Sequence, residues 1–278
     1  MRITFLGTGG AFTDYRVNYQ NNALVHTAEG PVLIDCGVTA CQSLKELGVP
    51  AADVRGVLFT HLHADHASPE QLAWERFYTG PAGPAYARTA LYAPGELLGP
   101  LRRSLEPFMD AYAGADGEIT EGGVDALLDL RPTAEVEIGG VRFRWFRVPH
   151  VVGATVDKAA YGIEIDDGAT RVLWSGDTTL SPGWVRAAAE DPRVARIYHE
   201  CLFAPRFRGT VHSHFEELAA LDPELTRKIC LMHHTAVPRG LDLSAFAGAA
   251  ARHEEHRLGP DGVQVRAPRP PAPPAGVE

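Results

Sequence analysis

The chain has 278 residues, 45% of them hydrophobic, and a formal net charge of −9 at pH 7. This length and content allow one large hydrophobic core or two small ones. The acidic balance argues against broad, charge-driven binding of nucleic acid, which needs a basic surface. It does not exclude a small anionic substrate, because metal ions would dominate the local field of a site.

The cysteines and the start of the chain indicate the cellular compartment of the protein. The four cysteines contain no C-x-x-C pair, which favours a reducing cytoplasm over a disulfide framework. A strand pattern begins at Arg2 and leaves no room for a signal peptide. No apolar stretch approaches membrane-spanning length, so we expect a cytoplasmic protein without a membrane segment.

Glycine and proline mark the first elements. Residues 7–10 (Gly-Thr-Gly-Gly) lack the lysine and spacing of a phosphate-binding loop and predict a tight turn. Leu44 and Leu47, followed by Gly48, predict a helix after Cys36 that ends on a glycine cap. Further on, Ser68-Pro69-Glu70-Gln71 predicts a helix start, with Gln71 placed for a capping box.

The most informative segment lies between these two helices. Val57-Leu58-Phe59 predicts a short buried strand, and Thr60-His61-Leu62-His63-Ala64-Asp65-His66 follows it directly. An H-x-H-x-D-H cluster brings three imidazoles and a carboxylate together where a strand ends. These are ligand types that zinc prefers, and two neighbouring metals can share them. The segment therefore predicts a metal site whose remaining ligands come from elsewhere in the chain.

Residues 79–130 differ in pattern from the predicted strands and helices on either side of them. They hold a Gly/Pro-rich stretch and then Leu101 to Tyr112, a pattern compatible with an amphipathic helix. A plain surface insertion and a substrate-capping or dimer element both remain open for this region.

Hairpins and helices alternate over the next hundred residues. Gly139-Gly140 lies between strand patterns at 136–138 and 141–148, and Asp167-Gly168 lies between patterns at 161–165 and 172–174. Ser181-Pro182 and Asp222-Pro223 predict helix starts. Hairpins with helices between them fit two packed sheets covered by helices. The proline-rich residues 266–278 predict a disordered or polyproline II tail.

Motif content and order resemble the metallo-β-lactamase superfamily, and in particular its ribonuclease Z-like branch. Besides the histidine motif, the resemblance rests on Met1–Phe12, Val32–Gly37, Pro149-His150, Trp174–Thr178, Tyr198–Cys201, Val211–Leu218 and Leu231–His233. The last three segments, with Asn18–Asn22, are most similar to the anti-Pycsar cyclic-nucleotide phosphodiesterases, phage and bacterial enzymes that destroy cyclic-nucleotide immune signals. The resemblance implies an α/β (α+β) fold over residues 1–265, an αββα sandwich of two mixed β-sheets flanked by helices.

The resemblance also implies a set of metal ligands. His61, His63 and His150 would hold one zinc; Asp65, His66 and His233 would hold the other; and Asp177 would bridge the two. Manganese or another divalent metal is an alternative to zinc. His234 is the alternative to His233 as the last metal ligand, and motif alignment favours His233.

Two further residues are implied for catalysis. His212 matches a histidine that contacts the scissile phosphate, and we predict that it also acts as general acid, with Glu200 orienting it. A capping or surface role for His212 and a catalytic role for His214 are the alternatives. We expect His199 to be structural, His253 and His256 to form a solvated helix face, and His26 to carry no motif.

Substrate class follows from spacing. The tRNA-processing relatives carry a long basic arm between the third histidine and the bridging aspartate, whereas here only residues 151–176 separate His150 from Asp177. We therefore predict hydrolysis of 3′,5′-cyclic nucleotides to nucleoside 5′-monophosphates, with no stable nucleic-acid binding. Alternatives are a tRNA 3′ endonuclease, a hydrolase of esters or lactones, and a nucleotide-sequestering protein without turnover. The resemblance also implies a homodimer.

Overall fold

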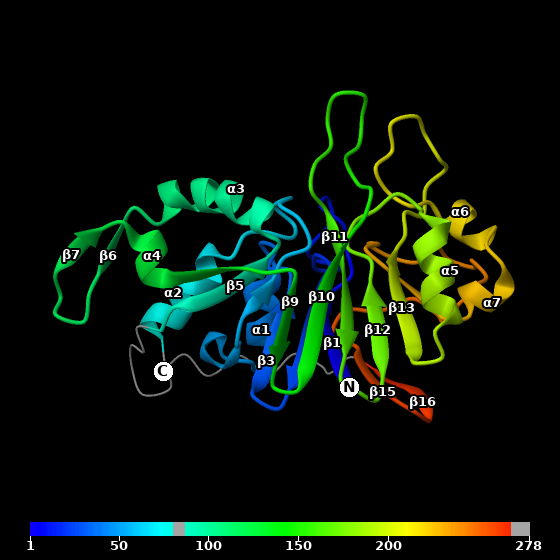
Figure 1. Ribbon diagram of the computed structural model, residues 1–278, viewed down its shortest axis with the longest axis horizontal. Coiled ribbons are helices and arrows are strands. Elements are labelled where there is room, and N and C mark those ends of the chain that lie inside the picture. Colours follow the sequence, from blue (N-terminus) through cyan, green and yellow to red (C-terminus); the bar gives the residue numbers. More distant parts are fainter. Residues whose placement is uncertain (80–86, 268–278) are drawn as a thin grey trace.

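Two β-sheets pack face to face in this computed structural model, which describes residues 1–79 and 87–267. Helices cover the outer face of each sheet, so the layers run helix, sheet, sheet, helix (Figure 1). Each sheet contains both parallel and antiparallel neighbours. The predicted sandwich of two mixed sheets is therefore confirmed.

The first sheet has eight strands. In spatial order they are β16 (Gly262–Arg266), β15 (Glu255–Gly259), β1 (Arg2–Gly7), β2 (Asn22–Thr27), β3 (Gly30–Ile34), β4 (Val57–Leu58), β5 (Thr89–Ala93) and β8 (Leu128–Pro132). Pairing is antiparallel from β16 to β3 and parallel from β3 to β8.

The second sheet has six strands. In spatial order they are β14 (Ile229–Met232), β13 (Val194–Glu200), β12 (Arg171–Trp174), β11 (Tyr161–Asp166), β10 (Val141–Arg147) and β9 (Glu135–Ile138). Strands β12, β13 and β14 are parallel, and the two predicted hairpins, β9–β10 and β11–β12, are antiparallel as expected.

The helices lie on the two outside faces. Those over the first sheet are α1 (Ala40–Glu46), α2 (Glu70–Tyr78), α3 (Gly95–Leu105) and α4 (Gly123–Leu127), and those over the second are α5 (Pro182–Glu190), α6 (Phe215–Ala219) and α7 (Pro223–Thr226). The short helix η1 (Ala51–Asp53) contacts α2, and η2 (Glu106–Phe108) contacts α3. A small hairpin of β6 (Ala111–Ala113) and β7 (Ile119–Glu121) projects beyond the helices of the first sheet (Figure 1).

Three hydrophobic clusters fill the interfaces between these layers, and the two-residue period of the strands divides side chains among them. In β3, Leu33 packs under the helices while Ile34 joins the cluster between the sheets. In β12, Trp174 points to the cluster between the sheets and Leu173 to the outer one. A one-residue slip in register would therefore exchange the side chains on the two faces of a sheet. Because such a slip is costly, the positions of the strand ends that carry the site are fixed.

The ends of α1, α2 and α3 differ in how well local pattern predicts them. Gly48, with φ of +67°, and the bonds Gly48 N–H to Lys45 O and Val49 N–H to Leu44 O end α1 as predicted. The capping box predicted at Gln71 is wrong, because Pro69 is the cap residue of α2 and makes no side-chain cap bond. The helix predicted at 101–112 is displaced to Gly95–Leu105, which includes Pro100; it ends before Pro107, whose missing backbone N–H disfavours a further α-helical turn.

Residues 79–130 contribute to the first sheet rather than forming only an insertion. Strand β5 lies within this range, and Leu97 and Leu101 of α3 are buried in the cluster beneath the helices. The β6–β7 hairpin is the part that stands apart from the sheets (Figure 1). Most of the predicted proline-rich tail, residues 268–278, lies outside the described residues. Within the described part of the chain, no helix is long and apolar enough to cross a membrane.

Candidate metal centre

The predicted site lies where several strands end at one edge of the sandwich. The histidine motif follows β4, His150 follows β10, Asp177 follows β12, Glu200 ends β13 and His233 follows β14. Carboxyl ends of parallel strands meet at a common edge, which is where open α/β sheets bind ligands. Residues separated by more than a hundred positions therefore converge through strand pairing.

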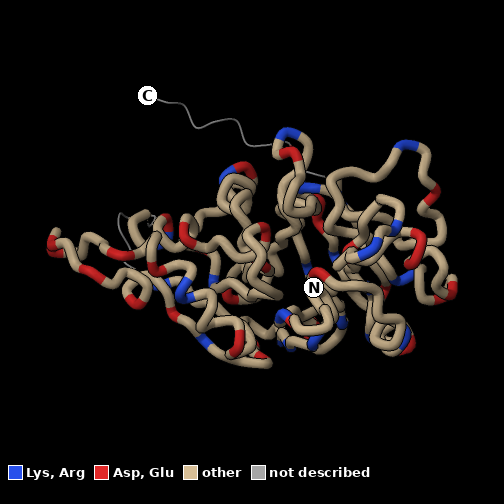
Figure 2. The backbone as a smooth tube through the Cα atoms, turned by 90° about the horizontal axis from the view of Figure 1, so that it is seen from above, with Lys and Arg blue, Asp and Glu red and all other residues tan. Residues whose placement is uncertain are grey.

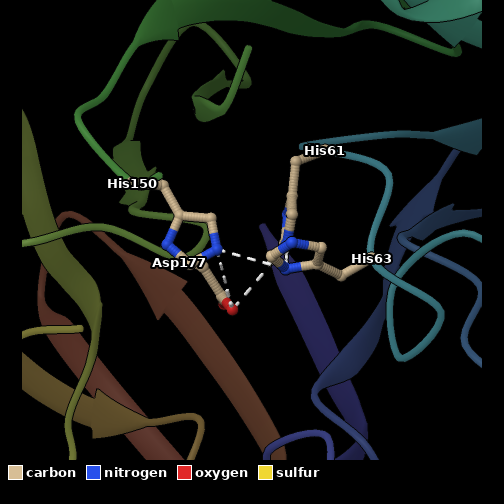
Figure 3. Close-up of side chains that lie close together, drawn as sticks. All are labelled: His61, His63, His150 and Asp177. Atoms are coloured by element: carbon tan, nitrogen blue, oxygen red, sulfur yellow. Dashed lines mark hydrogen bonds and ion pairs between the residues drawn. The ribbon is translucent and has the colours of Figure 1, made fainter. Parts of the chain in front are cut away.

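The first set of possible ligands contains His61, His63, His150 and Asp177, whose ligand atoms all lie within 4.8 Å of one another. His63 Nδ1 lies 3.1 Å from His61 Nε2 and 3.2 Å from His150 Nε2. The Asp177 Oδ2 atom lies 3.8 Å from His61 Nε2 and 4.0 Å from His150 Nε2. Figure 3 shows the three imidazoles gathered around the carboxylate of Asp177.

The second set contains Asp65, His66, Asp177 and His233. His66 Nε2 lies 3.3 Å from both Asp65 Oδ2 and Asp177 Oδ1. His233 Nε2 lies 3.5 Å from Asp65 Oδ2 and 3.3 Å from Asp177 Oδ2. All four side chains are buried, and Asp177 belongs to both sets. The arrangement brings together the seven residues in the two groups that the sequence predicts.

These two sets fit metal ions. Bonds of about 2.0–2.2 Å from zinc to nitrogen or oxygen place tetrahedral neighbours about 3.4 Å apart, close to most of the separations observed here. Three buried atoms that face the second set, His66 Nε2, His233 Nε2 and Asp177 Oδ1, have no hydrogen-bond partner. Buried polar atoms rarely lack a partner, so a cation is the group that this geometry accommodates.

The ring nitrogens facing away from the ligand sets are held by other groups. His66 Nδ1–H donates to Asp35 Oδ2 at 2.8 Å, and His150 Nδ1–H donates to the backbone oxygen of Val211 at 2.8 Å. The Nδ1 atom of His233 lies 3.4 Å from Glu200 Oε2. Such bonds fix the tautomer and orientation of a metal-binding imidazole. They leave Nε2 of each ring free to face the proposed metals.

Asp35 lies in the Val32–Gly37 segment that carries the resemblance, but it was not predicted as a site residue. It is fully buried at the end of β3, accepts hydrogen bonds from the backbone N–H and hydroxyl of Thr60 at 2.8 and 2.7 Å, and also holds His66. Its φ is +55° and that of His233 is +60°, a left-handed conformation that non-glycine residues adopt mainly at constrained sites. An aspartate directly after the apolar run Val32–Ile34 was the available signal.

Replacing Asp35 with asparagine is expected to lower metal affinity or activity by about 10- to 100-fold. The amide can still accept from Thr60 but presents an N–H to His66, which favours the tautomer with its proton on Nε2, toward the metal site. Competitive chelator titration of the variant checks this, with Asp53→Asn in η1 as control. Unchanged affinity and activity would contradict the assigned role.

Glu200 and His212 form a third group at the same place. His212 Nδ1–H donates to Glu200 Oε2 at 2.8 Å, and the same nitrogen lies 3.9 Å from Asp177 Oδ2. Burial alone would raise the pKa of Glu200, but hydrogen bonds from His212 and His233 outweigh it and lower the pKa. Burial lowers the pKa of His212, but Glu200 outweighs this and raises it. The pair therefore favours an ionised carboxylate beside a protonated imidazole.

The neighbouring histidines are excluded from these groups. His234 is buried and belongs to none of the three groups of possible ligands found among the described residues. His214 caps α6 in a capping box with Glu217, and its ring nitrogens contact Ala204 O and Thr210 Oγ1. The capping role considered for His212 thus belongs to His214.

The remaining histidines are structural. As expected, His199 is buried and stacks on Trp184 with ring centroids 5.3 Å apart. The predicted solvated helix face at His253 and His256 is wrong: both are buried, and His256 lies on β15 with its Nδ1 2.7 Å from Tyr198 Oη. The segment pairs with β1, so it becomes an inner strand. His26 on β2 contacts Arg2 and Thr4.

A cavity of about 1040 Å³ opens over the site. His63, Asp65, Asp177, His212 and His233 line it, so atoms of all three groups face one space. The volume is at the upper end of the roughly 300–1,000 Å³ typical of small-molecule sites. A substrate in this cavity can contact both ligand sets and His212 at once.

Comparison with known sequences identifies the family. A family profile described as "Anti-Pycsar protein Apyc1" matches residues 1–253. The Anti-Pycsar protein Apyc1 of Paenibacillus sp. (strain J14) is 30% identical over 269 residues, which cover 93% of this chain and 99% of that protein. The protein of the same name from Bacillus phage vB_BveM-Goe7 is 28% identical over 268 residues, covering 90% and 93%.

Solved structures show the same fold. The metallo-β-lactamase fold protein YhfI from Bacillus subtilis matches with a TM-score of 0.69 at 16% identity, covering 91% of this chain and 98% of that one. The short form of human tRNase Z matches with a TM-score of 0.63 at 16% identity, covering 92% and 98%. Together with the ligand groups, the family match confirms the prediction of a metal-dependent hydrolase. The chain belongs to the anti-Pycsar Apyc1 family and has the metallo-β-lactamase fold.

Proposed function

We propose that this protein is a dinuclear phosphodiesterase that hydrolyses 3′,5′-cyclic nucleotides to nucleoside 5′-monophosphates. The observation that carries the proposal is the position of Asp177, which belongs to both ligand sets and also to the group containing His212 and Glu200. Two adjacent metals and a proton donor around one carboxylate would together supply two established means of catalysing phosphodiester hydrolysis, metal-ion and general acid catalysis. The family name agrees, since it describes proteins directed against Pycsar.

Each group of residues has its own role in the proposed reaction. When bound, a pair of divalent metals lowers the pKa of water and neutralises charge on the phosphoryl group. In the proposed step, water attacks phosphorus and releases one proton to solvent, and the bond from phosphorus to the 3′ oxygen breaks. His212 donates its proton to that leaving oxygen, and Glu200 holds the resulting imidazole in place. Imidazole and carboxylate ligands favour zinc, with manganese as the alternative.

Charge and topology favour a small substrate over tRNA. Acidic and basic residues are interspersed along the backbone in Figure 2, with no continuous basic strip over the described residues in that view. Between His150 and Asp177, the chain forms a loop and the β11–β12 hairpin rather than a long arm. Both features fit a substrate that is held mainly at the metal site.

Incubation with a panel of 3′,5′-cyclic nucleotides, followed by chromatography, tests the proposal. We expect linear 5′-monophosphates from the metal-loaded protein and none from Asp65→Ala. Nucleotide bound in stoichiometric amounts without turnover would instead indicate a sequestering protein. Turnover confined to tRNA precursors, esters or lactones would replace the proposed substrate by that class.

We infer further that the protein acts in the cytoplasm against cyclic-nucleotide immune signalling. All four cysteines are buried free thiols, which fits a reducing compartment. Cells that produce such a signal in response to phage should lose protection when the wild-type protein is expressed. Protection retained during expression of active enzyme would refute this role.

A homodimer is the proposed assembly, with the projecting β6–β7 hairpin as its contact element. Phe108 before the hairpin and Ile119 on β7 are 66% and 72% exposed, two large apolar side chains that a partner protomer would cover. Light scattering after size exclusion should give twice the chain mass of 30.0 kDa. Phe108→Asp with Ile119→Asp should yield monomers, while Val265→Asp on β16 should not. A wild-type monomer would contradict the proposal.

A further inference from the structure

Exposed apolar side chains gather around the mouth of the active-site cavity. Ten large hydrophobic residues are exposed among the described residues, and four of them line this cavity: Phe12, Tyr15, Val38 and Phe207. Single exposed apolar residues are ordinary, but a cluster beside a site marks a binding surface. The cavity therefore combines charged ligand groups with an aromatic rim.

Phe12 lies on a turn whose first residue, Gly10, lies beside His233 of the second ligand set. The turn is closed by a bond from Thr13 N–H to Gly10 O at 3.1 Å, and Phe12 at its corner is fully exposed. A Cβ atom added to Gly10 would lie 3.2 Å from His233 Cε1, so this backbone contacts the site itself. Phe12 is thus held within two residues of a backbone position that touches a proposed metal ligand.

Phe207 comes from the loop that also supplies His212. Its ring packs edge-on against His214, with centroids 5.6 Å apart, and is still 55% exposed. The backbone oxygen of Phe207 accepts a hydrogen bond from Thr210 N–H at 3.4 Å. The same short segment therefore places one aromatic ring on the rim and the proton donor in the site.

We propose that Phe12 and Phe207 form the nucleobase subsite of this enzyme, an inference that rests on the proposed function. A cyclic nucleotide has the same two-part chemistry as the cavity, with an anionic phosphodiester at one end and a flat aromatic base at the other. Since the two rings and members of both ligand sets line one cavity, a nucleotide with its phosphate at the ligand sets can direct its base toward the aromatic rim. Stacking on aromatic side chains binds any base, because every base has a π face.

Two pairs of polar side chains in the same cavity are hydrogen-bonded to each other and are therefore not free to read base edges. The hydroxyls of Thr13 and Thr235 pair at 2.5 Å, and Gln20 Nε2–H donates to Tyr15 Oη at 3.1 Å. Both ring nitrogens of His234, which also lines the cavity, are buried and have no hydrogen-bond partner among the described residues. With its ring nitrogens buried, His234 is not an exposed reader of base edges, and we expect stacking area to dominate recognition, so purines should bind more tightly than pyrimidines.

Steady-state kinetics of Phe12→Ala, Phe207→Ala and the double variant test the subsite. The substrates are 3′,5′-cyclic AMP and a ribose 3,5-cyclic phosphate that lacks the base. We expect KM for cyclic AMP to rise by about 5- to 150-fold, the range found when a base-stacking residue is replaced by alanine. Hydrolysis of the base-free substrate should not change, and Phe207→Tyr should restore wild-type behaviour. Val265→Ala, at an exposed position outside the cavity, is the matched control.

A fluorescence signature separates stacking from a merely structural role. The cyclic monophosphate of 2-aminopurine riboside should lose fluorescence on binding to the wild-type enzyme in stopped flow, and keep it with the double variant. Equal losses of activity on both substrates, or an unchanged KM for cyclic AMP, would refute the proposed subsite but would not contradict the proposed function. If wild-type enzyme turned over the base-free diester but not cyclic AMP, both proposals would fail.

Discussion

Asp177→Asn is expected to lower kcat/KM for cyclic-nucleotide hydrolysis by about 10³-fold, because metal-ion catalysis contributes several kcal/mol of transition-state stabilisation. Asp177 belongs to all three groups of possible ligands, so its carboxylate affects each of them. Asparagine keeps the shape of the side chain but removes its charge, and an amide is a weaker ligand for a divalent metal. Two sites should therefore be weakened by one substitution.

Metal analysis of the purified variant distinguishes this explanation from misfolding. We expect two metal equivalents per wild-type chain and fewer than one per Asp177→Asn chain, with an unchanged circular dichroism spectrum. His150→Gln, which removes a member of the first set only, should retain the second metal. Asp242→Asn, at an exposed loop position, is the surface control. Full metal content and full activity in Asp177→Asn would refute a bridging role.

His212→Gln should reduce kcat for cyclic nucleotides by about 10²- to 10⁴-fold, the usual contribution of a positioned general acid. The leaving 3′ oxygen is a poor leaving group without a proton. Bis(4-nitrophenyl) phosphate releases 4-nitrophenolate, which leaves without protonation, so the same variant should hydrolyse it at nearly the wild-type rate. Comparing the two substrates therefore reports proton donation rather than metal binding.

Two further variants, one a control and one a second test, help to interpret the result for His212→Gln. His214→Gln removes a neighbouring histidine that caps α6 and should change neither substrate's kcat by more than a few-fold. Glu200→Gln keeps the shape but removes the charge that faces both His212 and His233. It should impair cyclic-nucleotide hydrolysis more than hydrolysis of the activated diester. An equal loss on both substrates in His212→Gln would mean that this histidine binds phosphate or metal instead of donating a proton.

Local sequence predicted the elements that depend on short-range chemistry. Gly139-Gly140 and Asp167-Gly168 mark hairpin turns that form where expected, since few other residues adopt those backbone conformations. Gly48 ends α1 for the same reason. The local pattern did not predict the start of α2 correctly. There the Ser68 hydroxyl donates a hydrogen bond to Ala64 O instead of capping the helix. The displaced helix around Pro107 is a second such case.

The sequence by itself determined the inventory of the site. Three histidines and an aspartate within six positions are local information, and the motif order supplied the distant partners. Tertiary structure decided which of these groups meet: it places His233 rather than His234 among the possible ligands, adds Asp35 behind His66, and brings Glu200 to two histidines. It also turned His256 from an expected exposed residue into a buried one. The reason is physical, because these contacts depend on strand register and sheet packing between distant segments, which local periodicity does not encode.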